Sequence, residues 1–367
     1  MMWATLNDTK VLIVARQNGS IQFLSPENGT VLKEFKNKHV GLEKEQGRFV
    51  GVSIHNNHLC VCTSTGDLSY TPLDVDDVNE TQSIAELGPD LEIMRAHPVK
   101  TNIFGIGGKE RDLTLFDLDV LMKQKEEETT TAAETDMNPA GPHQNTSAHK
   151  KKNTKAKGMI FQAKNIQNDF LDLRQPVWIH DFQFVDKDAT KIAVVTHYHQ
   201  FRLYDTKKGR RPCINAEIGK NPLRALCLGT DLNHVVYSDT ASTVGMIDIR
   251  TGKKAALFKG FTGSVTDVIT VPQPTLDNDD KKGHSSEPVM VSVSLDRFLR
   301  EHETTTVYRR MLNKAYLKQR LTCVLVDEEY EYPVPKVKTA EEEELEEEEA
   351  MWESMEVVKD RKRKHRS

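Results

Sequence analysis

The sequence predicts an all-β protein, and three observations lead to that prediction. Short runs rich in β-branched and aromatic residues recur along the chain, with turn residues between them. No amphipathic helical segment of ordinary length separates these runs. The runs also repeat at a spacing of roughly 45 residues, which is the period of units that each contribute one four-stranded sheet. The predicted fold is therefore a β-propeller.

Six segments each consist of a strand, a polar or glycine-containing turn and a second alternating strand, the pattern of a β-hairpin. They are residues 11–24, 58–73, 102–118, 191–205, 234–249 and 288–303. His97-Pro98 and Phe116-Asp117 stand where a WD repeat has its characteristic His and Trp-Asp. We therefore predict a WD-type propeller with six visible blades.

Two wide gaps between the hairpins contain polar insertions. Residues 123–158 and residues 272–288 are poor in apolar side chains and rich in charge, Pro, Gly, Ser or Thr. Such segments bury too little apolar surface to offset the entropy of ordering, so we expect both to be disordered.

The end of the repeat region predicts an incomplete seventh blade. "LTCVLV" (321–326) is a good strand pattern, but no partner strands follow it. We expect this lone strand to occupy the innermost position of a seventh blade, as if an N-terminal segment of about 40 residues were missing. Residues 1–9 are expected to be poorly ordered. The predicted domains are a propeller over 9–328 and a flexible tail over 329–367.

The composition of the chain limits the classes of function that we expect for it. The formal net charge of −5 arises in the tail, because residues 339–367 contain 11 acidic and 6 basic residues. The rest of the chain is balanced, which disfavours a broad nucleic-acid surface. No apolar run is long enough to span a bilayer, and the start "MMWATLNDTK" lacks the pattern of a signal peptide. Five cysteines suit a reducing compartment, so we expect a soluble intracellular protein.

No residue constellation predicts catalysis, a metal or a cofactor. Cys60 and Cys62 are expected to pack in the core, and the turn carboxylates Asp117, Asp205, Asp248 and Asp296 to be structural. His197 and His199 have alternate spacing, but no third metal ligand is identifiable. "GIGGKE" (105–110) superficially resembles a phosphate-binding loop, yet no helix follows it. We therefore predict a protein that is not an enzyme, with no small-molecule substrate.

"KNIQNDFLDLRQPVW" (164–178) joins the first insertion to the fourth blade and mixes polar with apolar residues. We expect Leu171, Leu173, Val177 and Trp178 to supply core packing. The polar residues are expected to lie over the propeller rim, where loops carry function on a rigid scaffold. Those predicted to contact a protein or RNA are Lys164, Asn165, Asn168, Asp169 and Arg174. The alternative is a loop that satisfies its own polar groups and caps the blade edge.

Basic residues elsewhere are candidates for phosphate contacts, which position a protein without reading sequence. The densest ordered group lies in "KKGRRP" (207–212) and comprises Lys207, Lys208, Arg210 and Arg211. In the tail, Leu345, Trp352 and Met355 share one helical face suited to docking in a groove of a partner. A nuclear import signal is predicted from Lys359, Arg361, Lys362, Arg363, Lys364 and Arg366.

Several connectors resemble one family specifically. They are "GGKERDLTLFDL", "FQAKNIQNDFLDLRQPVWIHDFQF", "HYHQFRLYD", "GRRPCINAEIG", "FKGFTGSV", "SLDRFLREH" and "YLKQRLTCVLV". Together they resemble the WD repeat-containing protein seventy-four family of animals, whose fungal counterpart is a nucleolar assembly factor of the large ribosomal subunit. The resemblance covers roughly residues 10–328, and the tail is only weakly similar.

The resemblance implies a seven-bladed propeller that acts as a non-catalytic scaffold in the nucleus and nucleolus. It implies a role in assembly and rRNA processing of large-subunit (pre-60S) precursors. The implied partners are pre-ribosomal assembly factors, ribosomal RNA, a nucleolar AAA-type ATPase and the exosome helicase. The alternative is a generic nuclear propeller adaptor, such as a substrate receptor of a ubiquitin ligase or a chromatin-complex subunit.

Overall fold

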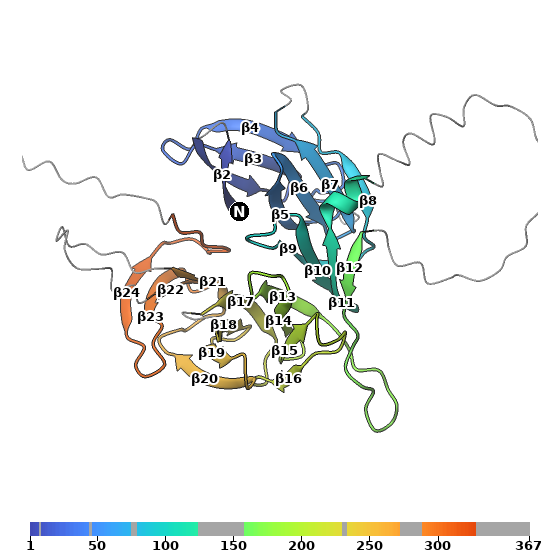
Figure 1. Cartoon of the computed structure of the whole chain (residues 1–367). Helices are drawn as coiled ribbons and strands as arrows, with labels where there is room; N and C mark the ends of the chain where they lie inside the picture. Colours follow the sequence, from blue (N-terminus) through green and yellow to red (C-terminus); the bar gives the residue numbers. More distant parts are fainter. Residues whose placement is uncertain are drawn as a thin grey trace, which may run out of the picture. The chain divides into compact units, whose positions relative to one another are not determined.

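The chain forms six antiparallel four-stranded sheets arranged as the blades of a β-propeller (Figure 1). This computed structural model describes residues 1–6, 9–43, 46–74, 79–123, 158–229, 233–271 and 288–327. Residues 1–326 make up one compact unit. Within the described ranges, no helix has the length and apolar character needed to cross a membrane.

The first three blades follow the chain in order. Blade one contains β1 (Met2–Leu6), β2 (Thr9–Ala15), β3 (Ser20–Leu24) and β4 (Val31–Lys36). Blade two contains β5 (Phe49–His55), β6 (His58–Thr63), β7 (Asp67–Pro72) and β8 (Ser83–Glu86). Blade three contains β9 (Leu91–Ala96), β10 (Ile103–Gly108), β11 (Arg111–Asp117) and β12 (Met159–Gln162).

The remaining blades repeat the same order. Blade four contains β13 (Ile179–Phe184), β14 (Lys191–Thr196), β15 (Gln200–Asp205) and β16 (Ile214–Glu217). Blade five contains β17 (Leu223–Leu228), β18 (His234–Asp239), β19 (Val244–Asp248) and β20 (Lys253–Phe258). Blade six contains β21 (Val265–Val271), β22 (Val289–Ser294), β23 (Phe298–Glu303) and β24 (Met311–Tyr316). The six hairpins predicted from the sequence are the second and third strands of these blades.

Each sheet packs face to face on its neighbours. The first strands of consecutive blades contact one another: β1 contacts β5, β5 contacts β9, β9 contacts β13, β13 contacts β17 and β17 contacts β21. Five apolar clusters lie between consecutive blades. The second strands of blades two to five are therefore covered on both faces, which explains continuous apolar runs such as "KIAVVT" in β14. The fourth strands alternate, as in "KKAALF" of β20, because one face meets solvent.

The Gly-rich stretch 105–108 belongs to a packed strand, β10. A Cβ atom at Gly105 would lie 2.8 Å from the ring of Phe182, and one at Gly107 would lie 2.8 Å from Ile179. Glycine at these two positions allows blades three and four to approach closely. The turn after β10 is formed by Lys109 and Glu110, so the glycines themselves do not make the turn.

The structure corrects two predictions about the ends of the repeat region. Met2–Leu6 form strand β1, which pairs with β2, so this segment is ordered. Residues 321–326 are extended but pair with no strand among the described residues. Instead, Thr266 Oγ1 donates to the Leu321 carbonyl (2.8 Å), the Val324 amide donates to Asp267 (3.0 Å), and Trp3 Nε1 donates to the Val326 carbonyl (3.0 Å). The segment thus joins the first strands of blades six and one.

The turn carboxylates and the cysteines have the structural roles predicted for them. Asp117, Asp205 and Asp248 each accept a backbone amide two residues further on. Cys60 and Cys62 are fully buried in the cluster between blades two and three. Burial raises the pKa of the Cys60 thiol to about 12, so it stays protonated and inert at neutral pH.

Candidate interaction site on the propeller rim

Two segments far apart in sequence meet on the rim, at the junction of blades three and four. One is the rim loop, residues 163–176, which connects β12 to β13. The other is the basic turn, residues 206–212, which connects β15 to β16. The Lys164 amide donates to the Arg210 carbonyl (2.7 Å), and Arg210 Nε donates to the Gln162 carbonyl (2.7 Å). The first bond joins the two segments, and the second joins the basic turn to the end of β12, directly before the rim loop.

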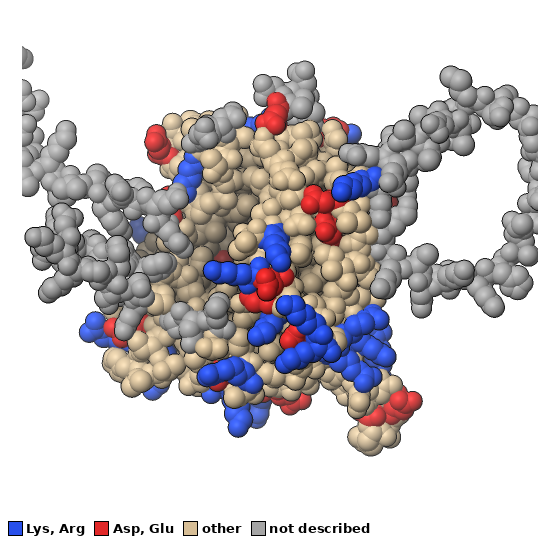
Figure 2. All heavy atoms as spheres, viewed as in Figure 1, with Lys and Arg blue, Asp and Glu red and all other residues tan. Residues whose placement is uncertain are grey.

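Cationic side chains from both segments gather around two adjoining surface hollows. Figure 2 shows Lys and Arg side chains clustered where the rim loop leaves the body of the propeller. The cations lining the hollows are Lys164, Arg174, Lys208, Arg210 and Arg211, which we call the basic rim patch. Lys207 lines neither hollow and lies 4.0 Å from Asp188. Seven of the nine residues singled out on the rim loop and the basic turn thus line these hollows, because Asn165 and Asn168 also do so; Asp169 and Lys207 do not.

The basic rim patch keeps most of its charge available to a partner. Arg174 lies 3.8 Å from Asp112, and Lys208 lies 3.8 Å from Asp205, but both cations are well exposed. Exposed pairs of this kind are weak and easily exchanged. Within the described ranges, no ion pair involves Lys164 or Arg211. Burial raises the pKa of Asp112, which the charge of Arg174 partly opposes.

The rim loop is held by hydrogen bonds within itself. The Asp172 amide donates to the Asp169 carbonyl (3.0 Å), and the Asp169 amide donates to the Leu173 carbonyl (3.1 Å). Asp172 has φ of 58°, in the left-handed region. A turn followed by one left-handed residue is a common three-residue hairpin loop with a bulge. The loop therefore has a defined conformation at its tip.

The polar residues predicted to face a partner are largely used inside the loop. Asp169 Oδ1 accepts the amides of Leu171 (2.9 Å) and Leu173 (2.8 Å). Asn168 Nδ2 donates to the carbonyl and to the carboxylate of Asp172 (3.1 and 2.8 Å). These side chains shape the tip, as in the alternative of a self-satisfied loop.

Asn165 was predicted to contact a partner, but it is buried and does not present an exposed amide. Its Nδ2 donates to the Gln175 carbonyl (2.5 Å), which ties the two ends of the loop together. Its Oδ1 accepts a hydrogen bond from Arg202 Nη1 (3.1 Å) on β15 of blade four. Asn165 therefore anchors the rim loop to the propeller.

The apolar residues of the rim loop also differ from prediction. Val177 is buried and Trp178 half-buried, but Leu171 and Leu173 are 62% and 59% exposed, and Phe170 is 93% exposed. Figure 1 shows the loop between β12 and β13 projecting away from the blades. Leu171 and Leu173 were expected in the core because apolar side chains usually belong there. The spacing of Asp169 and Asp172 is typical of a turn, and this signal would have placed Leu171 and Leu173 at a loop tip.

His197, one of the two histidines considered as metal ligands, packs against Trp178, which closely follows the rim loop in sequence. His197 stacks on Trp178 with ring centroids 4.1 Å apart, and its Nδ1 lies 3.3 Å from His180 Nε2. Burial and the neighbouring His197 lower the pKa of His180, which favours the neutral ring. No group of three potential metal ligands occurs in the part of the chain that the structure describes.

Comparison with known proteins places the chain among two groups of relatives. WD repeat-containing protein 74 of Bos taurus is 29% identical, over 99% of this chain and 81% of the relative. The Homo sapiens protein of that name is 28% identical over the same shares. Ribosome biogenesis protein nsa1 of Schizosaccharomyces pombe is 25% identical, over 95% of this chain and 83% of the relative. No family model matches the chain.

The chain is a homologue of WD repeat-containing protein 74 and NSA1. The alignment with the bovine protein includes nearly the whole chain, so it spans the rim loop and the basic turn. The family resemblance inferred from the connector sequences is therefore confirmed.

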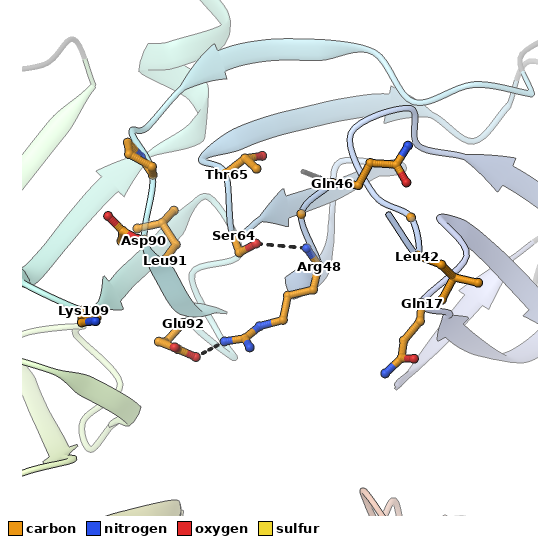
Figure 3. A pocket seen from close by; sticks show the side chains of 13 residues that line it. Gln17, Leu42, Gln46, Arg48, Ser64, Thr65, Asp90, Leu91, Glu92 and Lys109 are labelled. Atoms are coloured by element: carbon orange, nitrogen blue, oxygen red, sulfur yellow. Dashed lines mark hydrogen bonds and ion pairs between the residues drawn. The ribbon is translucent and has the colours of Figure 1, made fainter. Parts of the chain in front are cut away.

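A further hollow of this NSA1 homologue lies at the turns of blades one to three and measures 640 Å³ (Figure 3). Arg48 forms an ion pair with Glu92 across it, and the Arg48 amide donates to Ser64 Oγ (3.0 Å). Its lining contains neither histidine nor cysteine. Two cations, Arg48 and Lys109, and two carboxylates, Asp90 and Glu92, line this hollow, so its charge is balanced, unlike that of the basic rim patch.

The predicted tail motifs lie outside the described residues. These are the docking face of Leu345, Trp352 and Met355 and the basic run over 359–366.

Proposed function

We propose that this chain is a non-catalytic WD-repeat scaffold in ribosome biogenesis. It acts in assembly and rRNA processing of large-subunit (pre-60S) precursors, in the nucleus and nucleolus. The observation that carries the proposal is similarity along nearly the whole chain to proteins named for ribosome biogenesis. The propeller supports it, because rigid blades with exposed loops present several contact surfaces at once.

A scaffold role accords with how the chain uses its reactive side chains. The buried thiols are protonated, and the turn carboxylates bond to their own loops. His197 is engaged by Trp178 and His180. None of these groups is arranged as a nucleophile with a neighbouring base. This supports a protein that binds and positions partners and does not transform a substrate.

The rim loop and the basic rim patch together form the proposed contact surface. Five cations with few firm partners attract the phosphates of rRNA or the carboxylates of an assembly factor. The proposed partners are pre-ribosomal assembly factors and rRNA, and by family resemblance a nucleolar AAA-type ATPase and the exosome helicase. The tail adds two proposed elements, a docking face at Leu345, Trp352 and Met355 and an import signal over 359–366.

Purification of the tagged chain from cells tests the proposal. We expect large-subunit precursor proteins and precursor rRNA to co-purify, and the tagged chain to sediment with pre-60S particles. Depletion of the protein should lower free large subunits relative to small subunits. Co-purification of cullin-type ligase subunits or chromatin proteins, without ribosomal precursors, would instead identify a generic propeller adaptor.

A further inference from the structure

The tip of the rim loop exposes three large apolar side chains on a fixed turn. Phe170 and Leu171 occupy the two corner positions of the turn, and Leu173 follows the left-handed Asp172. Turn corners usually carry Gly, Pro, Asn, Asp or Ser. The described part of the propeller supplies no ring contact to Phe170, which is 93% exposed. Folding therefore gives no reason for apolar residues at these corners.

We propose that this tip is a protein-docking element that inserts Phe170, Leu171 and Leu173 into an apolar pocket of a partner protein. Apolar residues displayed together on a protein surface mark sites of interaction. Aromatic side chains that fill a pocket are typical anchors of protein interfaces. The projection of the loop from the blades makes it suited to enter a concave site (Figure 1).

The hydrogen bonds of the tip reduce the entropy lost on docking. Asp169 Oδ1 fixes two amides, and the Asn168 amide group fixes Asp172 from the opposite side of the turn. The anchor side chains are thus presented in one backbone conformation before a partner arrives. Preorganisation of this kind increases affinity because less freedom is lost on binding.

The chemistry of the tip favours protein over RNA. The carboxylates of Asp169 and Asp172 stand beside the apolar side chains and repel phosphate. Leucine side chains neither stack on bases nor form hydrogen bonds with them, unlike the aromatic and basic residues that read single-stranded RNA. Phe170 is the one side chain of the tip that could stack on a base. The three apolar side chains taken together are matched by an apolar pocket.

The base of the loop indicates the charge of the partner. A tip of three side chains is too small to bury the area of a stable protein interface, so neighbouring surface must contribute. The surface next to it is the basic rim patch, with Lys164 and Arg211 without ion partners in the described ranges. The partner should therefore carry acidic residues around its apolar pocket.

The identity of the partner as a pre-ribosomal protein rests on the proposed function, whereas the docking chemistry does not. Two variants separate the tip from ordinary surface effects. The tip variant is F170S/L171S/L173S. The control variant is V307S/Y308S on the loop between β23 and β24, where Val307 and Tyr308 are also strongly exposed. Both should keep the unfolding midpoint of the natural chain, because the changed side chains are on the surface.

Photo-crosslinking tests the proposal directly. The full chain carries Phe170→benzoylphenylalanine, or Val307→benzoylphenylalanine as the control, and is irradiated in cells and purified under denaturing conditions. We expect one protein to crosslink from position 170 well above its level from position 307. Co-purification of that protein should fall at least tenfold in the tip variant and less than twofold in the control variant.

Three results would overturn the docking proposal while leaving the proposed function intact. The first is crosslinks from position 170 to RNA, and the second is a crosslink pattern equal to that of position 307. The third is full retention of the crosslinked protein by the tip variant. In each case the chain would still sediment with pre-60S particles. Conversely, a tip-dependent protein partner without ribosomal precursors would support the docking element and contradict the proposed function.

Discussion

Blades four and six each bury an arginine at the same position of their third strand, but the two arginines bind different partners. Arg202 and Arg300 are the third residues of β15 and β23, and they are 1% and 0% exposed. Arg300 Nη2 bonds to Asp296 Oδ2 (2.5 Å), and Arg300 Nη1 bonds to Ser294 Oγ (2.8 Å). These partners belong to the hairpin of its own blade.

Among the described residues, Arg202 has no carboxylate partner within hydrogen-bond distance, and it binds neutral amides. Its Nη1 donates to Asn165 Oδ1 (3.1 Å) and its Nη2 to Gln200 Oε1 (2.6 Å). Asn165 belongs to the rim loop, so this arginine reaches outside its hairpin. One buried position thus serves two purposes. In blade six the arginine stabilises the blade, and in blade four it anchors an interaction loop.

The largest expected effect is at Arg300. The R300M variant should lower the free energy of unfolding by about 3 to 5 kcal/mol, because it leaves the Asp296 carboxylate without its cation. Urea denaturation measures the loss. As a control, D296N/R300M should lose less than R300M alone. A loss below about 1 kcal/mol for R300M would show that the ion pair does not stabilise blade six.

The next prediction concerns how the contribution of the Arg300–Asp296 ion pair to stability depends on pH. Hydrogen bonds from Arg300, Ser294 and Thr262 hold the pKa of Asp296 well below its ordinary value against the effect of burial. A folded pKa below the unfolded value contributes stability at neutral pH that is lost as pH falls through the acid range. D296N should therefore cost about 1.5 to 3 kcal/mol at pH 7.

The difference between D296N and the natural chain should shrink progressively below about pH 4, near the ordinary pKa of an aspartate. Denaturation curves collected across the acid range measure it. A constant difference between pH 7 and pH 3 would contradict the ionic role of Asp296.

The expected effect at Arg202 is smaller, because its partners are neutral. R202M should cost about 1 to 2 kcal/mol, the net value of two buried hydrogen bonds. It should also increase amide hydrogen exchange in the rim loop, which loses its anchor at Asn165. The distinction between the two blades would be wrong if R202M lost as much stability as R300M or more, while amide hydrogen exchange in the rim loop stayed unchanged.

The smallest expected effect is at Asp172. The left-handed conformation there suits glycine, so D172G should change stability by less than about 0.5 kcal/mol despite loss of the carboxylate contact. D172V should cost about 1 to 2 kcal/mol, because a β-branched residue resists this conformation. Similar stabilities for the two variants would mean that the turn is not fixed as described.

The sequence predicted the blades because period-two alternation within each hairpin and the repeat between hairpins are local signals. It missed β1, although the residues "ND" at 7–8 stand between two β-rich runs and are a turn signal. It also assigned a strand to 321–326, where side chains of the neighbouring blades (Thr266, Asp267 and Trp3) supply the hydrogen bonds in place of a partner strand.

The rim site was only partly predictable. Both of its segments stand out in the sequence for their polar and basic residues. Their meeting depends on how blades three and four pack, which no local pattern encodes. The sequence gives no distinction between an apolar residue that enters the core and one displayed at a tip, so Leu171 and Leu173 were misplaced. Likewise, Asn165 and Asn168 have the same chemistry but opposite burial.

Hydroxyl-radical footprinting of the chain, free and in purified precursor particles, tests the central claim that the anchored rim loop contacts a partner. Side chains of Phe170, Leu171 and Leu173 should be oxidised rapidly in the free protein and strongly protected in the particle. Val307 and Tyr308 are similarly exposed on another loop and provide the internal reference. We expect protection of the tip well above that of the reference. Equal oxidation of the tip in the free and particle-bound states would contradict it.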